Sequence, residues 1–391
     1  MVDYGFVDSF MEKVRREGRE RRLSRVTRQD DGTVIIDGRE YVDFCSNDYL
    51  GLSFRTELKD AAVDAISLYG CGSGASRLMS GNLSVQESLE DEVARLKGKA
   101  CALVTGSGYL ANIGVIPALA GRHDVVFSDR LNHASIVDGI RLSGAKMIRF
   151  HHNDMSHLEE LLLKNRKEFN RAVIVVESIY SMDGDIAPID ETIDLARRFD
   201  ALVVVDEAHA VGVYGECGEG IVTHEQAQEI DCIIGTFGKA FGGYGAFVAM
   251  DDRLKTYMLH RCRTFIFSTA LPPAVVAANI EGVRLAREAK ELRARLFANI
   301  ATFRNAIEEK TGKVMPGVSQ IVPVITGSNE TAVKLERVLL ENGFFAKAIR
   351  PPTVPQGSAR IRFSVTAMHS HEQLVDVAAV VADFMSSPDI I

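Results

Sequence analysis

LVVVDEAHAVGVYG (202–215) and IIGTFGKAFGG (233–243) are the stretches of this chain that decide its fold. Each is built on a short apolar run, Leu202–Val205 in the first and Cys232–Gly235 in the second. A short apolar run bounded by turn residues is typical of a strand that is buried in a parallel sheet. The sequence therefore predicts two buried parallel strands in this region.

Polar residues follow both predicted strands at the point where each strand ends. Asp206 and His209 follow the first strand, and Thr236 and Lys239 follow the second, with Lys239 in a glycine-rich turn. In an open α/β sheet, ligands bind beyond the carboxyl ends of the strands. We therefore expect these four side chains to converge on one ligand.

The combination of Lys239 with Asp206 indicates pyridoxal phosphate. A lysine can hold the aldehyde of this cofactor as a Schiff base, and a buried carboxylate can keep its pyridine nitrogen protonated. Taken singly, Lys239 is better explained as a solvated loop lysine and Asp206 as a helix cap. Taken together, at one edge of one sheet, the two residues favour the cofactor.

Asp206–His209 also spells the DEAH sequence of nucleic-acid helicases. Such enzymes need a phosphate-binding loop of the form GxxxxGK[ST]. The nearby candidate, Gly235–Lys239, has too short a spacing and is followed by Ala240, and no other Gly-Lys-Ser/Thr occurs in the sequence. The sequence thus disfavours a helicase.

The length and composition are those of a soluble globular protein that is large enough for more than one domain. Of the 391 residues, 46% are hydrophobic and 25% are charged, and the net charge of −8 argues against a nucleic-acid surface. We find no apolar run near the ~18 residues of a membrane span and no secretory signal. Six scattered cysteines predict reduced thiols in a cytoplasmic protein, without a metal site.

From residue 100 the pattern alternates between strands and helices. Helix-length segments such as Ile189–Phe199 separate most of the strands. This order predicts an α/β fold with a doubly wound, largely parallel sheet of about seven strands. The gap between the last two strands is too short for a parallel crossover, so we expect them to be antiparallel neighbours. The seven runs are Cys101–Thr105, Val125–Ser128, Met147–Phe150, Ala172–Glu177, Leu202–Asp206, Cys232–Thr236 and Gly245–Met250.

The segments that flank this sheet predict smaller units at both ends of the chain. Residues 3–28 have the pattern of an amphipathic helix, and a hairpin around Asp37–Gly38 follows. Residues 274–311 are nearly continuous helix, and a small α+β unit comes after them, with a strand expected over 344–349. The predicted domains are an N-terminal segment (1–45), a large α/β domain (46–275) and a small α+β domain (276–391).

The motif TGSGYLAN (105–112) follows a strand and opens a helix, so its backbone N–H groups form an anion site. It also fits GxGxxA, and Asp129 lies about 20 residues further on, as in a dinucleotide site. A nicotinamide-dependent oxidoreductase is therefore the second function class. That interpretation gives no role to Asp206 and Lys239, whereas the same loop suits the phosphate of pyridoxal phosphate equally well.

Further polar residues follow other predicted strands. His133 could stack on a planar cofactor, although a helix-capping Asn132 beside a surface histidine is the alternative. Ser181 is a plausible hydroxyl donor. Ser268 and Thr269 either cap a helix that begins at the next prolines or bind phosphate. In the predicted strand at 359–365, two arginines, Arg360 and Arg362, share one face and suit a substrate carboxylate, although a solvated face is the alternative for at least one of them.

With these residues assembled, the chain resembles the α-oxoamine synthases, the fold-type-I pyridoxal-phosphate enzymes (aspartate aminotransferase-like transferases) that condense an amino acid with an acyl thioester. The resemblance covers residues 40–370, in family order. It is carried by SNDYLGL (46–52), GSGASRLMSGN (72–82), TGSGYLAN (105–112), SDRLNHASIVDG (128–139), ESIYSMDGDIAP (177–188), VVDEAHAVGVYG (204–215), GTFGKAFGGYG (235–245), FSTALPP (267–273) and ARIRFSVTAMH (359–369).

The resemblance implies roles for the matching residues. Lys239 would form the Schiff base and move the α-proton, and Asp206 would pair with the pyridine nitrogen. His133 would stack on the ring. The other cofactor-binding residues implied are Ser107, Gly108, Tyr109 and Thr236 at the phosphate, His209, Ser181 and Glu177 around the ring, and Ser268 or Thr269 from the second subunit of a homodimer with shared active sites.

The resemblance also implies a substrate site. Asn47 and Arg362 would bind the substrate carboxylate, and Arg21 would contact the acyl substrate. Thr353 is a further predicted substrate-binding residue. Within the family the chain is most similar to the branch that condenses L-alanine with a pimeloyl thioester in biotin synthesis, a preference indicated by Asn47–Asp48. Branches that use glycine with acetyl-CoA, glycine with succinyl-CoA, or serine with a long acyl chain stay open, as does a catalytically inactive family member that acts as a scaffold. The thioester carrier, coenzyme A or a carrier protein, also stays open.

Overall fold

The structure, a computed structural model, describes residues 2–387. The chain forms two compact units. Leu50–Ser181 and Asp185–Arg293 form the large unit. The described parts of Met1–Tyr49, Met182–Gly184 and Ala294–Ile391 form the small unit.

This division differs from the predicted domain boundaries at both ends of the large domain. Residues 276–293 belong to the large unit, where α11 (Pro273–Glu288) packs against α2 (Thr56–Tyr69) and α3 (Ser84–Lys97). The N-terminal segment is part of the small unit, where β3 (Arg39–Asp43) pairs in parallel with β12 (Phe344–Phe345). Such pairing between the two ends of a chain leaves no signal in local sequence, because periodicity reports only neighbouring residues.

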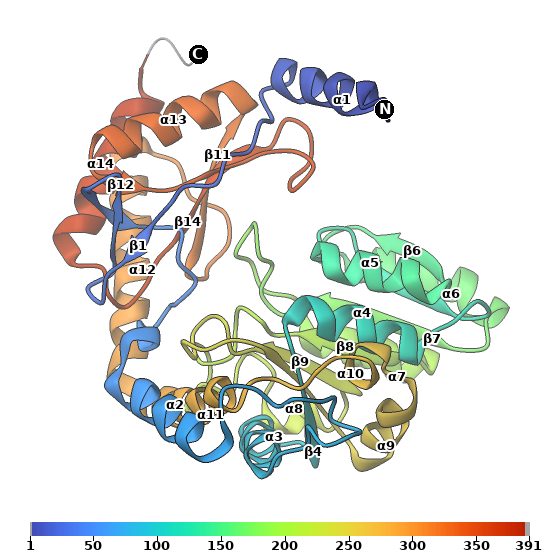
Figure 1. The fold of residues 1–391 in the computed structure, drawn as a ribbon. Helices are drawn as coiled ribbons and strands as arrows, with labels where there is room; N and C mark the ends of the chain where they lie inside the picture. Colours follow the sequence, from blue (N-terminus) through green and yellow to red (C-terminus); the bar gives the residue numbers. More distant parts are fainter. Residues whose placement is uncertain (1, 388–391) are drawn as a thin grey trace. The chain divides into compact units, whose positions relative to one another are not determined.

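A seven-stranded sheet forms the centre of the large unit, as predicted (Figure 1). Its order is β4-β10-β9-β8-β7-β5-β6, in which β10 runs antiparallel to both of its neighbours and the other pairs are parallel. The expectation of antiparallel final strands is therefore confirmed. The strands are β4 (Cys101–Thr105), β5 (Val125–Asp129), β6 (Lys146–Phe150), β7 (Ala172–Glu177), β8 (Leu202–Asp206), β9 (Cys232–Thr236) and β10 (Ala246–Met250).

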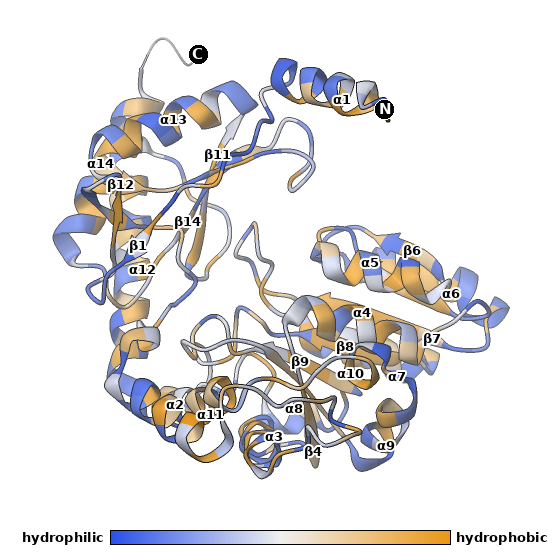
Figure 2. Ribbon diagram, viewed as in Figure 1, coloured by the Kyte–Doolittle hydropathy of each residue, from blue (hydrophilic) through white to orange (hydrophobic). Residues whose placement is uncertain are grey.

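Continuous burial explains why these segments are strands. Every residue of β7 and β9 is buried, so both faces of the sheet exclude water there, and both strands are hydrophobic up to their carboxyl ends (Figure 2). Cys101 and Cys232 lie in this core, as expected. The remaining elements of the large unit are α4 (Gly108–Leu119), α5 (Ala134–Ser143), α6 (Met155–Asn165), α7 (Ile189–Phe199), α8 (His224–Ala227), α9 (Asp252–Arg261), α10 (Arg263–Ile266) and the 3₁₀ turns η1 (Leu52–Phe54) and η2 (Arg166–Glu168).

The small unit contains two short sheets, with strand orders β1-β2-β3-β12 and β11-β14-β13. The predicted hairpin is confirmed by the antiparallel pairing of β2 with β3. The single strand expected over 344–349 is in fact two strands, because β12 pairs with β3 whereas β13 pairs with β14. The elements are β1 (Thr27–Arg28), β2 (Thr33–Ile36), β11 (Ile321–Gly327), β13 (Ala348–Ile349), β14 (Ala359–Ser364), α1 (Gly5–Arg16), α13 (Asn329–Glu341) and α14 (His371–Met385).

Two predicted helices are shorter than expected. The helix predicted over 3–28 ends at Arg16, because Gly18 adopts a left-handed conformation with φ of 61° and its N–H bonds back to the Arg15 carbonyl. The helix predicted over 274–311 is divided at Ala289 into α11 and α12 (Lys290–Thr311). None of the helices that the structure describes is long and apolar enough to cross a membrane.

Candidate active site

The carboxyl ends of β8 and β9 bring the predicted lysine and histidine together. Lys239 Nζ lies 2.9 Å from His209 Nε2, although the two residues are 30 positions apart in sequence. His209 is buried and Lys239 is half-buried. The turn that carries Lys239 is closed by a bond from the Gly242 N–H to the Lys239 carbonyl. Gly242 has φ of 71°, and a Cβ there would lie 2.5 Å from the Ser53 nitrogen, so the turn requires glycine.

Asp206 ends β8 as a buried side chain whose two oxygens are both hydrogen-bonded. Oδ2 accepts a 2.7 Å bond from Asn112 Nδ2, and Oδ1 accepts a 2.9 Å bond from the Ala208 N–H. Asn112 lies on α4, is itself buried, and also bonds Ser135 Oγ at 3.0 Å. The sequence prediction gave Asn112 no role. The available signal was the presence of a polar residue, Asn112, on the otherwise apolar helix α4, because core packing does not explain a buried amide.

His133 and Glu177 form the next part of this edge. His133 is the N-cap of α5, and its ring Nδ1 lies 2.8 Å from Ser135 Oγ. The cap is therefore His133 itself and not Asn132, whose side chain bonds the Val175 carbonyl. Glu177 accepts a hydrogen bond from the His133 N–H.

The environments of these two side chains shift both pKa values. Desolvation by the surrounding protein lowers the pKa of His133, which favours a neutral ring. Burial, followed by the charge of Asp206, raises the pKa of Glu177 to about 8. A neutral imidazole and a largely protonated carboxyl group therefore border this edge at neutral pH.

The predicted phosphate site lies at the start of α4. Ser107 is the N-cap, and its Oγ accepts a 3.1 Å bond from the Leu110 N–H, so α4 begins at Gly108, within the motif that was predicted to open a helix. Tyr109 donates its side-chain hydroxyl to Asp138, so its predicted role rests on its backbone N–H. The Thr236 hydroxyl donates to the Gly245 carbonyl at 2.8 Å, and it must turn away from that carbonyl to contact a phosphate.

The serine and threonine candidates occupy two different settings in the large unit. Ser181 is buried just beyond β7. Thr269 is exposed and forms an isolated β-bridge with Ser76, in the segment GSGASRLMSGN (72–82). The Ala270 N–H donates a 3.0 Å bond to the Ala75 carbonyl beside it. The alternative that Ser268 or Thr269 caps α11 is wrong, because the N-cap is Pro272 and receives no side-chain bond. Their contact with a second subunit stays a prediction.

The predicted substrate residues form two pairs within the small unit. Arg362 Nη1 bonds Asn47 Oδ1 at 3.2 Å and Ser364 Oγ at 2.7 Å. Arg21 Nη2 lies 3.5 Å from Thr353 Oγ1, a contact at the limit of a hydrogen bond. The structure thus brings Asn47 to Arg362 and Arg21 to Thr353. Their action on the same substrate as Lys239 stays a prediction.

Arg360 has a structural role. It is 3% exposed, and its Nη1 bonds Asp183 Oδ1 at 2.7 Å and the Met182 carbonyl at 3.0 Å. The alternative of a solvated face is therefore wrong for both arginines, since Arg362 is 9% exposed. The strand β14 is buried along its whole length, which a pattern of alternating arginines does not reveal.

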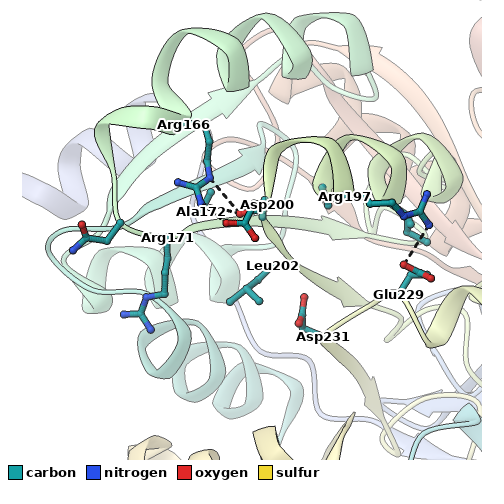
Figure 3. Close-up of a pocket in the computed structure, with 12 residues that line it drawn as sticks. Arg166, Arg171, Ala172, Arg197, Asp200, Leu202, Glu229 and Asp231 are labelled. Carbon is teal, nitrogen blue, oxygen red and sulfur yellow. Dashed lines mark hydrogen bonds and ion pairs between the residues drawn. The ribbon is translucent and has the colours of Figure 1, made fainter.

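A separate pocket of about 340 Å³ lies at the opposite edge of the large sheet (Figure 3). It is lined by Ala172 and Leu202, the residues that begin β7 and β8, and by three arginines. Figure 3 shows Arg166 paired with Asp200 and Arg197 paired with Glu229. Its distance from the carboxyl ends of the strands, and the pairing of its basic groups, leave it without the features of an active site.

The residues of the large unit fit a phosphorylated pyridine aldehyde better than a dinucleotide. They offer a lysine amine, a buried carboxylate, a neutral imidazole and a helix N-terminus. Asp129, which the dinucleotide interpretation assigned to a ribose, already accepts bonds from the N–H groups of Leu131 and Asn153 and lies beside His152. The nicotinamide-dependent interpretation is therefore not supported at this residue.

Comparison with known proteins gives consistent relatives. Residues 39–381 match the family Aminotransferase class I and II. Over 375 residues the chain is 48% identical to the 8-amino-7-oxononanoate synthase of Geobacter sulfurreducens, covering 95% of this chain and 96% of the relative. It is similar to the structure of a serine palmitoyltransferase variant from S. paucimobilis with bound PLP–myriocin aldimine, with a TM-score of 0.90, 29% identity, and coverage of 99% of this chain and 98% of that one. It is similar to the crystal structure of the 8-amino-7-oxononanoate synthase of Francisella tularensis, with a TM-score of 0.76, 29% identity, and coverage of 88% and 97%.

Proposed function

Because the chain belongs to the aminotransferase class I and II family, we propose that it is a pyridoxal-phosphate-dependent acyltransferase that condenses L-alanine with pimeloyl-CoA. The products are 8-amino-7-oxononanoate, CoA and CO₂, in the synthesis of biotin. The observation that carries this function is the 48% identity, over 95% of the chain, to a relative of that name. The resemblance to the α-oxoamine synthases is confirmed by the named relatives.

The large unit supplies the residues that would hold pyridoxal phosphate. The N–H groups that begin α4 suit the phosphate, and Asp206, held by Asn112, suits a protonated pyridine nitrogen. When bound, pyridoxal phosphate supplies an electron sink that stabilises negative charge at the α-carbon of the substrate. The full set of residues proposed is Ser107, Gly108, Tyr109, His133, Glu177, Ser181, Asp206, His209, Thr236 and Lys239, with Ser268 or Thr269 from a second subunit.

Lys239 is the base that would remove the α-proton of alanine. Its Nζ lies 2.9 Å from His209 Nε2, so the amine has a fixed neighbour at the sheet edge. Placing a base within hydrogen-bond distance of the proton that it takes contributes about 10²–10⁴-fold to a rate. His133, as a neutral ring, would lie against the cofactor without adding charge to it.

The small unit supplies the residues proposed for the substrate. The guanidinium of Arg362 suits a carboxylate because its N–H groups form a planar fork, and Asn47 sits beside it. Arg21 and Thr353 are proposed for the acyl substrate. Arg362 would orient the carboxyl group that leaves as CO₂.

The assembly and location of the protein are also proposals. The family resemblance supports a homodimer in which each active site receives residues from both subunits. Exposed aromatic side chains of the large unit, such as Phe267 at 70% and Tyr244 at 57%, suit a contact of this kind. The reduced thiols and the biosynthetic reaction support a cytoplasmic enzyme.

Other branches of the family are the alternatives that need to be separated. Solved structures of both branches are similar at 29–30% identity and so do not separate them, whereas the 48% identity to the relative named 8-amino-7-oxononanoate synthase favours alanine with pimeloyl-CoA. The family branches that condense glycine with acetyl-CoA or succinyl-CoA would depend on the same lysine chemistry. An inactive scaffold is disfavoured, since Lys239, His209 and Asp206 lie together at one sheet edge.

A substrate panel tests this proposal. The protein with added pyridoxal phosphate is incubated with alanine, glycine or serine, each combined with acetyl-, succinyl-, pimeloyl- or palmitoyl-CoA, and thiol release is measured. We expect release with alanine and pimeloyl-CoA at least about tenfold faster than with any other pair, because one or two misfit groups cost 1–3 kcal/mol. Faster release with glycine and a short acyl-CoA would keep the family and overturn the substrate. Silence across the panel would overturn CoA as the carrier and favour a carrier protein.

A further inference from the structure

His152 lies between two carboxylates in the large unit, in the turn that joins β6 to α6. Its Nδ1 is 3.0 Å and 3.1 Å from the two oxygens of Asp129, and its Nε2 is 2.5 Å from Asp185 Oδ2. The ring is 17% exposed and the Asp129 side chain is fully buried. The proposed reaction assigns no role to any of these three residues.

The two contacts together require a positively charged ring. A carboxylate can only accept a hydrogen bond, and a neutral imidazole has one N–H to give, whereas an imidazolium has two. Burial alone lowers the pKa of His152, but its hydrogen bonds with Asp129 and Asp185 outweigh burial and raise this pKa to about 9. The same contact, with two backbone N–H groups, lowers the pKa of Asp129 although burial raises it. The cluster therefore holds a cation between two anions at neutral pH.

The first of these carboxylates anchors the loop between β5 and α5. Asp129 is the last residue of β5, and its oxygens also accept a 2.8 Å bond from the Leu131 N–H and a 2.9 Å bond from the Asn153 N–H. His133, which is proposed to lie against the cofactor ring, follows Asp129 by four residues. The conformation of this loop therefore depends on the ion pair between Asp129 and His152.

The second carboxylate anchors the segment that follows β7. The Asp185 carbonyl accepts a 3.1 Å bond from the Tyr180 N–H, next to Ser181, and Asp185 Oδ2 accepts a 2.9 Å bond from Asn153 Nδ2. The Tyr180 ring stands edge-on to the His152 ring, with centroids 4.4 Å apart and an interplanar angle of 88°. Asn153 has φ of 53°, a left-handed conformation that asparagine tolerates. These contacts fasten the second loop to the same imidazole.

We propose that His152 is a positioning residue that, as an imidazolium, ties the His133 loop to the Ser181 loop and so shapes the cofactor site. This inference rests on the proposed function only in taking His133 and Ser181 as cofactor contacts. His152 itself does not touch the reacting atoms in this account. Loss of its charge leaves Asp129 and Asp185 facing a neutral ring, which removes the ion pairs that hold both loops.

We call the contacts of His152 with Asp129 and Asp185 the clamp. The charge of His152 limits the clamp to a defined pH range. The groups that face its ring are Asp129 from β5 and Asp185 and Tyr180 from the segment after β7. Because the pKa in the folded protein lies above the usual value of 6.5, the stabilisation is complete below about pH 6.5 and is lost as the pH rises through about 9. Cofactor affinity should therefore weaken on the alkaline side.

The test measures the affinity of the apoprotein for pyridoxal phosphate by absorbance titration, without substrates, from pH 7 to pH 10. The variants are His152→Gln, which fills a similar volume without charge, and His151→Gln as a matched control one residue away, on an exposed side chain. We expect His152→Gln to weaken the affinity at pH 7 by at least about tenfold and to lose the fall in affinity near pH 9 that the wild type shows. Any change near pH 8 that follows the titration of Glu177 should stay in both proteins. His151→Gln should match the wild type at every pH.

A milder variant keeps the proposal testable if His152→Gln does not fold. Asp185 is 28% exposed in its side chain, so Asp185→Asn removes one carboxylate with little change in packing. With one anion gone, the ring should lose its proton at a lower pH, and the alkaline fall in affinity should shift to lower pH by one unit or so. A purely structural role for Asp185 would not move this midpoint, the pH at which the affinity for pyridoxal phosphate has fallen by half.

The outcomes separate the clamp from the proposed function. Equal affinities for wild type and His152→Gln, or an unchanged midpoint in Asp185→Asn, would overturn the positioning role alone. A wild-type protein that binds no pyridoxal phosphate would overturn the proposed function and the clamp with it. Hydrogen exchange of residues 129–133 in the apoprotein gives a second readout, and we expect faster exchange there in His152→Gln than in His151→Gln.

Discussion

Lys239→Ala should lower the rate of condensation by roughly 10⁴-fold or more. On the proposed mechanism, the alanine would remove both the base for the α-proton and the amine that holds the cofactor, and each of these functions contributes several orders of magnitude. Lys239 Nζ lies 2.9 Å from His209 Nε2 at the sheet edge. The described turn 236–243 contains no other amine or carboxylate that could replace it. The loss should fall on kcat, since the proposed role of Lys239 is in the transition state.

The measurement is steady-state release of CoA from alanine and pimeloyl-CoA, with two comparison variants. Lys239→Arg keeps the positive charge but cannot give up a proton near neutral pH, so it should be as inactive as the alanine variant. Lys164→Ala removes an exposed lysine on α6 and should match the wild type. Turnover by Lys239→Ala within tenfold of the wild type would show that another group is the base.

Asp206→Asn should lower kcat by roughly 10³-fold. The substitution keeps the size of the side chain but removes the charge that would hold a proton at the pyridine nitrogen, and losing one preorganised electrostatic partner costs about 10²–10³-fold or somewhat more. Asp206 is buried and bonded by Asn112 and the Ala208 N–H, so solvent does not replace the lost charge.

Steady-state kinetics with saturating pyridoxal phosphate checks this effect on kcat, and absorbance titration reports whether the cofactor still binds. Asp200→Asn is a matched control, because Asp200 lies between α7 and β8 with a fully exposed side chain and φ of 50°, which asparagine tolerates. It should leave kcat unchanged. An Asp206→Asn variant with full kcat, or one that is defective only in cofactor binding, would contradict the electrostatic role.

Much of the large unit could be predicted because its signals are local. Four of the predicted strands, Cys101–Thr105, Ala172–Glu177, Leu202–Asp206 and Cys232–Thr236, have the predicted bounds, since a continuous apolar run between turn residues specifies a buried strand. The same reasoning predicted the edge at which Lys239 and His209 meet, because parallel strands end on one side.

The features that the sequence did not predict depend on contacts between distant segments. The split of 344–349 into β12 and β13 follows from pairing with different sheets, and β3 lies about 300 residues earlier in the chain. Asn112 was missed as the partner of Asp206 because the contact spans 94 positions. His152 was missed for the same reason, since its two carboxylates lie 23 and 33 positions away.

The most direct measurement of the central claim is the mass spectrum of the product formed from alanine and pimeloyl-CoA, with alanine labelled by ¹³C in its carboxyl group. The account predicts 8-amino-7-oxononanoate without the label, together with labelled CO₂ and free CoA in equal amounts, and none of these from Lys239→Ala. A product that retains the label, or CoA release without the amino ketone, would contradict decarboxylative condensation at this site.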